Sequence, residues 1–303
     1  MLKTLSLISF TFLSLQSWAG SLYDVKIKDV PLYDVFKKQG VPEAALQRTF
    51  EFLEVNGGKT VRVRGKVRER SRAYMADKEV TIKNSNMAAI IDFSLPSSER
   101  RLFVLNLKTG AVSKHFVAHG KGSGVKVASK FSNIDGSKMS SLGFYLGGTT
   151  YYGSHGESLN LYGLESSNNK AAERDIVMHA ADYVSEDFVK SQGRLGRSWG
   201  CPAVAPGILP KMLNNFKEGG VIYAYHADLI KASSKNPTLQ EVDHHDDDED
   251  IDLPGEEESI RNGGAPLTTS AVKPESVGEV ANVPVPTAAP REQIASPAQA
   301  EQK

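Results

Sequence analysis

The chain of 303 residues contains a single cysteine, Cys201. One thiol cannot form an intramolecular disulfide, so a fold held together by internal disulfides is excluded. A lone cysteine is then an inert buried residue, a partner for another chain, or a reactive thiol. Composition alone leaves these three alternatives open.

Long apolar runs are also missing once the first residues are passed. The run Leu5–Leu15 is uncharged, follows Lys3, and is succeeded by small residues up to Ala19, a layout typical of a secretory signal peptide. Eleven helical residues extend only about 16 Å, short of the roughly 30 Å hydrocarbon core, so a membrane anchor is disfavoured. We therefore expect residues 1–19 to be removed and the mature protein to be periplasmic or secreted, without a membrane span.

The formal net charge of zero hides two regions of opposite sign. Residues 20–240 contain 31 basic and 21 acidic residues, whereas residues 241–258 contain 11 acidic residues and no lysine or arginine. A basic body favours an anionic partner. Export argues against nucleic acid and favours the anionic bacterial cell wall. We also expect the acidic run to fold back on the basic body and compete with the wall.

No metal or cofactor is expected from the sequence. His119 and His155 belong to no metal-binding spacing. The acidic run resembles a calcium loop in part, but Ile251 stands where such a loop requires glycine. Nothing in the sequence indicates an oligomeric state.

The composition changes along the chain predict three regions after the signal segment. Residues 20–81 are predicted to be a small helical lead-in, whose main helix starts near Pro42 and stops at Gly57-Gly58. Residues 82–232 contain short apolar runs separated by Gly- and Ser-rich turns, which predicts a mainly β sandwich or barrel. Residues 233–303, acidic and then rich in Pro and Ala, are predicted to be disordered.

Several elements of the β region can be placed individually. A hairpin turn is predicted at 108–110, a buried strand at 175–180, and a last strand at 219–226. A short helix is predicted between Ser185, which can cap its start, and Gly193, which can end it.

The stretch "GRSWGCPAV" gives Cys201 a setting that suits a nucleophile. His179, at the end of a predicted strand, supplies a base that is distant in sequence, the usual layout of a cysteine nucleophile and its histidine. Gly200 permits close approach of a substrate carbonyl. The amides of Gly200 and Cys201 are predicted to form an oxyanion hole, an interaction worth about 3–4 kcal/mol. The residues alone still allow Cys201 to be a small buried apolar side chain.

"IVMHAADYV" followed by "GRSWGCPAV" resembles the active-site segment of YkuD-like L,D-transpeptidases, in particular their exported murein L,D-transpeptidase catalytic domains. The family pattern is a histidine followed by Ser/Thr-His-Gly-Cys, matched here by His179 and residues 198–201. Upstream, "IIDFSLPSSERRLFVLNLKTGAV", "VAHGKGSG", "FSNIDGSKMSSLGFY" and "LYGLE" are similar in the same order. The likeness covers about residues 42–225. The chain departs from the pattern at Trp199, where the family has histidine.

The resemblance implies a reaction on peptidoglycan stem peptides, with roles in cell-wall biogenesis and cell shape. Cys201 would attack the L-centre carbonyl of the third residue, His179 would take the thiol proton or form an ion pair with the thiolate, and the carbonyl of Ala180 would orient the histidine. Release of the terminal D-Ala leaves a thioester. An amine acceptor gives a crosslink or an exchanged D-amino acid, whereas water makes the protein an L,D-carboxypeptidase. A non-catalytic wall-binding module is a third alternative, which the intact His179 and Cys201 pair disfavours.

Other residues near the motif are weaker candidates. Arg194 and Arg197 are predicted to bind a substrate carboxylate, unless they are simply solvated charges. Trp199 is predicted to line the stem peptide, with core packing as the alternative. Tyr162 is a candidate oxyanion donor, although a tyrosine in a strand more often packs. His119 lies in the matched set of segments and is expected near the cleft. Ser198 belongs to the nucleophile loop.

Overall fold

The computed structural model describes residues 21–69, 72–83 and 86–229. The predicted signal segment 1–19 and the predicted tail 233–303 lie outside these residues. All of the described residues belong to one compact unit. Among them, no helix is long and apolar enough to cross a bilayer.

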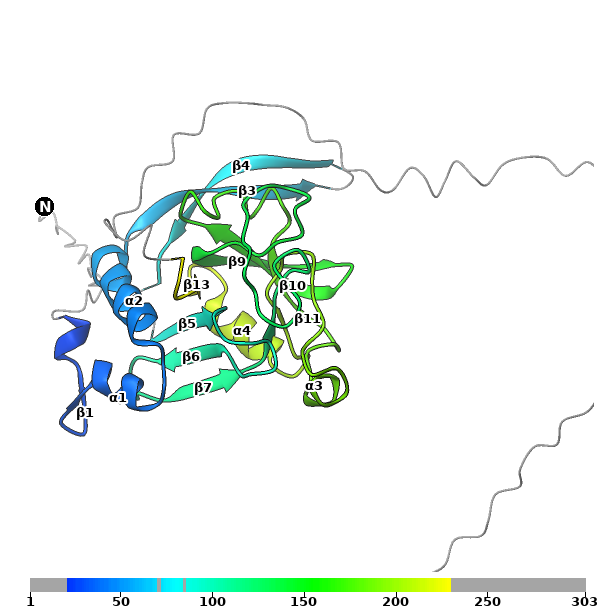
Figure 1. Cartoon of the computed structure of the whole chain (residues 1–303). Coiled ribbons are helices and arrows are strands. Elements are labelled where there is room, and N and C mark those ends of the chain that lie inside the picture. Colours follow the sequence, from blue (N-terminus) through cyan, green and yellow to red (C-terminus); the bar gives the residue numbers. More distant parts are fainter. Residues whose placement is uncertain (1–20, 70–71, 84–85, 230–303) are drawn as a thin grey trace, which may run out of the picture. The chain divides into compact units, whose positions relative to one another are not determined.

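The described chain contains five helices and thirteen strands (Figure 1). In chain order they are η1 (Leu22–Asp24), β1 (Lys26–Ile27), β2 (Val30–Pro31), α1 (Leu32–Lys38), α2 (Glu43–Asn56), β3 (Thr60–Glu69), β4 (Arg72–Thr81), β5 (Met87–Asp92), β6 (Leu102–Asn106), β7 (Val112–His115), β8 (Val117–Ala118), β9 (Gly143–Gly153), β10 (Gly156–Gly163), β11 (Val177–Ala180), α3 (Glu186–Gln192), β12 (Ala203–Val204), α4 (Leu209–Phe216) and β13 (Val221–Tyr225).

Nine of the strands form one sheet in the order β7-β6-β5-β13-β9-β10-β11-β12-β8. Only the β5–β13 and β11–β12 pairs are parallel. The two strands at the ends of this order, β7 and β8, are separated along the chain by the single residue Phe116. Such a short connection requires the sheet to curl until its two edges lie close together. The predicted mainly β fold is confirmed, as one strongly curved sheet.

Both faces of this sheet are buried. Successive side chains of a strand point to opposite faces, so one strand can contribute to an apolar cluster on each face. In β13, the side chains of Val221, Tyr223 and Tyr225 join one apolar cluster, whereas Ile222 and Ala224 join the cluster on the opposite face. A strand covered on both faces reads as a nearly continuous apolar run, as "VIYAY" does.

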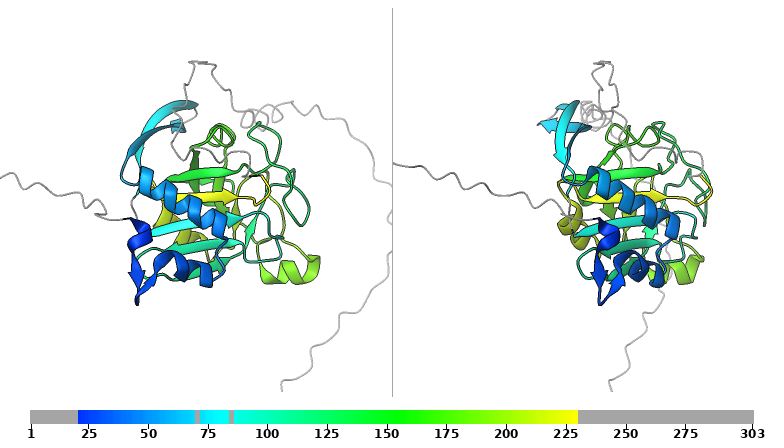
Figure 2. Two further views of the ribbon diagram at one scale, coloured as in Figure 1. Left: turned by 60° about the vertical axis from the view of Figure 1, so that its left-hand side comes forward. Right: turned by 90° about the vertical axis from the view of Figure 1, so that its left-hand side faces the viewer.

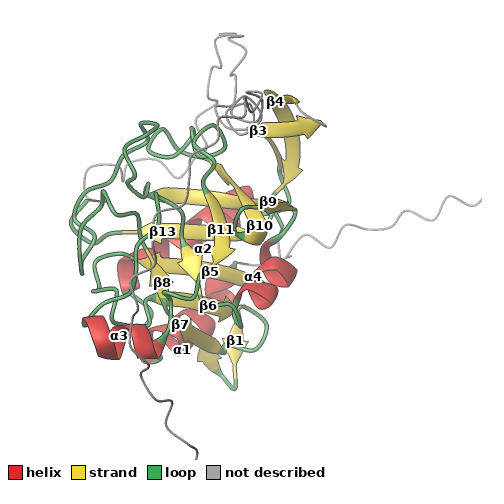
Figure 3. Cartoon of the chain, turned by 90° about the vertical axis from the view of Figure 1, so that its right-hand side faces the viewer, coloured by secondary structure: helices red, strands yellow, loops and turns green. Residues whose placement is uncertain are grey.

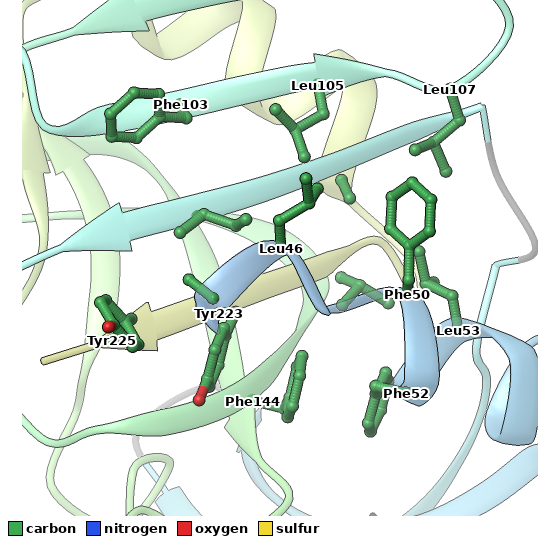
Figure 4. Packing of buried hydrophobic residues seen from close by; sticks show 14 of the residues in the cluster. Leu46, Phe50, Phe52, Leu53, Phe103, Leu105, Leu107, Phe144, Tyr223 and Tyr225 are labelled. Atoms are coloured by element: carbon green, nitrogen blue, oxygen red, sulfur yellow. The ribbon is translucent and has the colours of Figure 1, made fainter. Parts of the chain in front are cut away.

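Helix α2 covers one face and lies across the strands in Figure 2. Its Phe52 ring stacks on Phe144 of β9 at 4.0 Å between centroids, and Phe144 stacks on Tyr223 of β13 at 4.1 Å (Figure 4). Helix α4 buries Met212 and Phe216 against the other face and contacts β5, β9, β10 and β11. Figure 3 shows these helices in red around the yellow strands. The predicted lead-in helix is therefore part of the core of the domain.

Several predicted elements are confirmed in detail. Helix α2 ends at Asn56, directly before Gly57-Gly58. The hairpin turn at 108–110 joins β6 to β7, and β11 and β13 are the predicted buried strands. The Ser185 hydroxyl caps α3 by accepting the N–H of Phe188, and Gly193 ends it in the left-handed conformation.

The second part of the lead-in differs from the prediction. Residues 60–81 form β3 and β4, an antiparallel hairpin of ten-residue strands, rather than helix. The sequence of β3, "TVRVRGKVRE", alternates valine with basic residues, and this period of two favours a strand. The hairpin contacts β10 (Figure 1). A Cβ added at Gly65 would lie 3.1 Å from the ring of Tyr162.

Candidate active site

Strands β11 and β12 bring Cys201 and His179 into the same region. They pair in parallel, with His179 opposite Ala203, and the same register places Cys201 beside Val177. The Cys201 Sγ accepts the Val177 N–H at 3.5 Å and donates to the Asp175 carbonyl at 3.6 Å. Residues two apart on a strand share a face. Cys201 therefore lies two residues before Ala203 of β12, level with Val177, which is two residues before His179 on β11.

A backbone contact fixes the tautomer of His179. Its Nδ1 lies 2.9 Å from the carbonyl oxygen of Ala180, and a carbonyl can only accept, so Nδ1 carries the proton. Nε2 is then free of a proton and available as a base. Burial lowers the pKa of His179, against a smaller opposite effect of the Ala180 carbonyl, so the ring is neutral at neutral pH.

A second imidazole lies on this base. His155, in the turn between β9 and β10, stacks on His179 with 4.3 Å between ring centroids and 17° between planes. His155 is exposed, and its charge contributes to lowering the pKa of His179. The turn between β9 and β10 therefore covers His179 and helps to lower its pKa.

The thiol of Cys201 also favours its neutral form. Burial raises its pKa and the carboxylate of Asp175 adds to this, while the Val177 N–H and the Arg174 guanidinium act in the opposite direction. A neutral thiol beside a neutral imidazole suits transfer of the thiol proton during attack. It does not favour a preformed thiolate–imidazolium pair.

The loop before Cys201 has a conformation that requires glycine. Gly200 has a φ of +133°, and a Cβ there would lie 2.9 Å from the carbonyl oxygen of Met139. The Ser198 hydroxyl donates to the Cys201 carbonyl at 2.6 Å and accepts the Gly200 N–H at 3.1 Å. The Gly200 amide is therefore engaged, which differs from the prediction that both amides face a substrate. The Cys201 amide makes no hydrogen bond to another residue in the described part of the chain and stays a candidate oxyanion donor.

The segments around Gly120 and Ser140 are hydrogen-bonded to the loop of residues 198–200 that precedes Cys201. The Lys121 N–H donates to the Ser198 carbonyl at 2.8 Å. The Ser140 hydroxyl accepts the Gly120 N–H at 3.0 Å and donates to the Gly200 carbonyl at 2.9 Å. Segments far apart in sequence thus hold the backbone around Cys201 in one arrangement.

His119 is close to this loop but turned away from its surface. Its side chain is fully buried, and its Nδ1 lies 2.7 Å from a guanidinium nitrogen of Arg101, itself fully buried. Burial and the charge of Arg101 lower the pKa of His119 to about 4. The carbonyl of His119 accepts the Ser198 N–H, so its contribution to the loop is structural.

Tyr162 is placed away from Cys201. It is buried in the cluster beneath α2, whereas Cys201 packs against the cluster on the opposite face of the sheet. This position gives Tyr162 a packing role.

The two arginines beside the motif contact backbone carbonyls. Arg197 donates to the carbonyls of Lys121 and Gly124, and Arg194 donates to that of Leu195. Trp199 is at the surface, with 68% of its area exposed, so the alternative of core packing does not apply.

Comparison with known proteins identifies the domain. The model of the L,D-transpeptidase catalytic domain family matches residues 62–225, more than half of the chain. The chain belongs to this family. The resemblance found in the sequence is thereby confirmed, and because the match begins within β3, the hairpin of β3 and β4 is part of the L,D-transpeptidase domain.

Solved structures of L,D-transpeptidases are similar at low identity. The LD transpeptidase LdtMt1 in complex with imipenem is 13% identical, with a TM-score of 0.30 over 53% of this chain and 66% of that chain. The L,D-transpeptidase from Mycobacterium smegmatis is 12% identical, with a TM-score of 0.30 over 56% of this chain and 68% of that chain. This chain therefore spans about two thirds of the length of each. No curated protein matches it in sequence.

Two residues near Cys201 carried no signal in the sequence. Arg174 donates to the carbonyls of Ser132 and Met139, which fixes the loop beside Gly200, and its buried Nε has no partner. Asp175 forms ion pairs with Lys66 at 2.7 Å and Arg68 at 2.6 Å, both from β3. Neither residue belongs to a motif, and only the folded chain brings them to Cys201.

Proposed function

We propose that this L,D-transpeptidase domain acts on peptidoglycan stem tetrapeptides through a thioester on Cys201. The observation that supports the proposal is the parallel pairing of His179 with Ala203, two residues after Cys201, together with the Nδ1 contact to the Ala180 carbonyl that leaves Nε2 free to act as a base. The export predicted from residues 1–19 would deliver the protein to the compartment of this substrate.

The reaction follows from the protonation states. Sγ of Cys201 attacks the L-centre carbonyl of the third residue, and the thiol proton passes to Nε2 of His179. The Cys201 N–H donates to the oxyanion that forms, an interaction worth about 3–4 kcal/mol. On collapse, His179 returns the proton to the nitrogen of the departing D-Ala, and a thioester remains.

The acceptor determines the product. An amine from a second stem peptide or a free D-amino acid attacks the thioester, and His179 takes a proton from it. The product is a crosslinked or exchanged peptide with the thiol restored. If water attacks instead, the same site performs L,D-carboxypeptidation and leaves a tripeptide.

The test uses residues 20–303, the chain that would remain after cleavage at Ala19. It is incubated with purified tetrapeptide muropeptides, and the products are identified by mass spectrometry beside Cys201→Ala and His179→Gln. We expect dimers or exchanged termini from the wild type, no product from Cys201→Ala, and a reduction of at least about 100-fold for His179→Gln. Tripeptide alone would assign carboxypeptidase activity. Absence of both product and thioester in the wild type would leave the wall-binding module.

A further inference from the structure

The ammonium groups of two lysines lie over the exposed indole ring of Trp199, close in sequence to Cys201. The Nζ atoms of Lys121 and Lys138 each lie 4.7 Å from the ring centre of Trp199. A cation over an indole face is attracted by the electrons of the ring. Trp199 precedes Cys201 by two residues, so this cluster borders the reacting thiol.

The positive charge of this cluster is not neutralised locally. In the described ranges, neither Lys121 nor Lys138 forms an ion pair with a carboxylate. The nearest acid in sequence to Lys138 is Asp135, whose charge acts on the guanidinium of Arg174. Two ammonium groups over one ring, neither of them paired with a carboxylate among the described residues, favour a bound anion.

Backbone hydrogen bonds join the segments that bear the three side chains. The Lys121 N–H donates to the Ser198 carbonyl at 2.8 Å, and the Gly122 N–H donates to the Lys138 carbonyl at 2.8 Å. Lys138 has a φ of +56°, which a residue with a side chain adopts rarely. Strained conformations of this kind persist where the surroundings impose them, often at functional sites.

The distance of the cluster from Cys201 suits the terminal carboxylate of the substrate. Cα atoms two residues apart are separated by at most about 7 Å, so Trp199 is roughly one to two residue lengths from Cys201. The carboxylate of a terminal amino acid lies one residue beyond the carbonyl that is attacked. A carboxylate is opposite in charge to the two ammonium groups, and its two oxygens can accept hydrogen bonds from both.

We propose that Lys121 and Lys138, held on Trp199, bind the carboxylate of the terminal D-amino acid that is released from the donor stem peptide. This inference rests on the proposed function, since it assigns one side of that same site. By microscopic reversibility, a free D-amino acid acting as acceptor places its carboxylate on the same two lysines. The histidine usual in the family at position 199 would not offer an indole face to hold them.

The test compares two donors that differ only in this group, tetrapeptides ending in D-Ala or in D-alaninamide. Release of the terminal residue is followed by mass spectrometry for the wild type, for the double variant Lys121→Gln/Lys138→Gln, and for the control Lys130→Gln. Lys130 is an exposed lysine of the same loop that the proposed site does not include. We expect the wild type and the control to prefer the free acid by at least tenfold, and the double variant to lose most of this preference.

The outcomes separate the inference from the proposed function. Equal rates for acid and amide in the wild type, or an undiminished preference in the double variant, would overturn the carboxylate site while leaving the thioester mechanism intact. Release of neither terminal residue by the wild type would instead count against the proposed function. A double variant that misfolds is recognised by loss of carbapenem acylation of Cys201. In that case the variant Trp199→Leu is used, which keeps both lysines but removes the indole ring beneath them. We expect it to weaken the preference for the free acid over the amide.

Discussion

At the scale of single residues, the site is governed by what burial does to two titratable groups. It raises the pKa of the Cys201 thiol and lowers that of His179, so each is held in its neutral form. The Ala180 carbonyl then decides which nitrogen of the imidazole is the base. Position and tautomer, rather than a resting ion pair, prepare the attack.

His155 offers a direct test of this arrangement. His179 must lose its proton to act, so kcat/KM should rise with pH through a limb that lies below the ordinary histidine value of about 6.5. His155→Phe keeps an aromatic ring on His179 but removes the neighbouring charge that helps to lower its pKa. We expect the acidic limb to move to higher pH, with activity at pH 8 within about twofold of wild type.

The control is His115→Phe, in β7, which does not contact His179. It should leave the limb in place. A limb that is unchanged in His155→Phe, measured as kcat/KM between pH 5 and 8, would show that the stacked ring only packs.

Sequence reasoning reached part of this site and missed part of it, for a physical reason. Cys201, His179 and Ser198 lie in short stretches whose residue types carry chemistry, so the motif was sufficient to propose them. His155 and Asp175 act on the site through folding alone, and no pattern of neighbours in sequence reveals such contacts. Tyr162 is the opposite case. Its side chain is suitable and its segment matches the family, but it packs on the face of the sheet opposite to Cys201.

At the scale of elements, the hairpin of β3 and β4 connects the first part of the chain to the nucleophile. Lys66 and Arg68 of β3 pair with both carboxylate oxygens of Asp175, and Lys66 also donates to the carbonyl of Glu173. The Asp175 carbonyl in turn accepts from the Cys201 Sγ. The hairpin therefore compensates a negative charge that would otherwise raise the pKa of the thiol further.

Removal of that compensation should slow the enzyme. In Lys66→Met/Arg68→Met we expect kcat/KM to fall about five- to tenfold, which corresponds to about 1 kcal/mol. We also expect alkylation of Cys201 by iodoacetamide to require higher pH. Adding Asp175→Asn should restore the alkylation profile. Asparagine tolerates the positive φ of 52° at this position.

Arg64→Gln serves as the matched control. Arg64 is a cation of the same strand, but it pairs with Asp77 inside the hairpin. Its loss should change neither kcat/KM nor the alkylation profile. If Arg64→Gln and the double variant are equally impaired, the hairpin acts by packing rather than by charge.

The elements also show which structures local sequence can predict. Helices α2 and α3 were predicted correctly because proline, serine and glycine at their ends specify where the backbone starts and stops. The β3–β4 hairpin was missed because the helical character of the preceding residues was extended across it. Its valines alternate with basic residues, and that period of two was the available signal.

At the scale of the whole molecule, charge is segregated along the chain. Residues 20–240 have about ten more bases than acids, whereas the acidic run 241–258 has no base at all. The basic residues include Lys121, Lys138 and Arg197 around the site. We therefore expect an anionic polymer and the acidic run to compete for the same surface.

We predict that deletion of residues 233–303 strengthens binding to purified peptidoglycan at low salt. Interactions between exposed charges are screened beyond about 10 Å at 0.1 M salt, so the difference should be several-fold near about 0.02 M and disappear by about 0.5 M. Co-sedimentation with sacculi over a salt series measures it, with catalysis prevented by Cys201→Ala in every variant. Deletion of residues 264–303 alone keeps the acidic run and should bind as the full chain does. Equal low-salt binding by the 233–303 deletion and the full chain would mean that the acidic run does not reach the basic surface, and that the wall meets that surface unopposed.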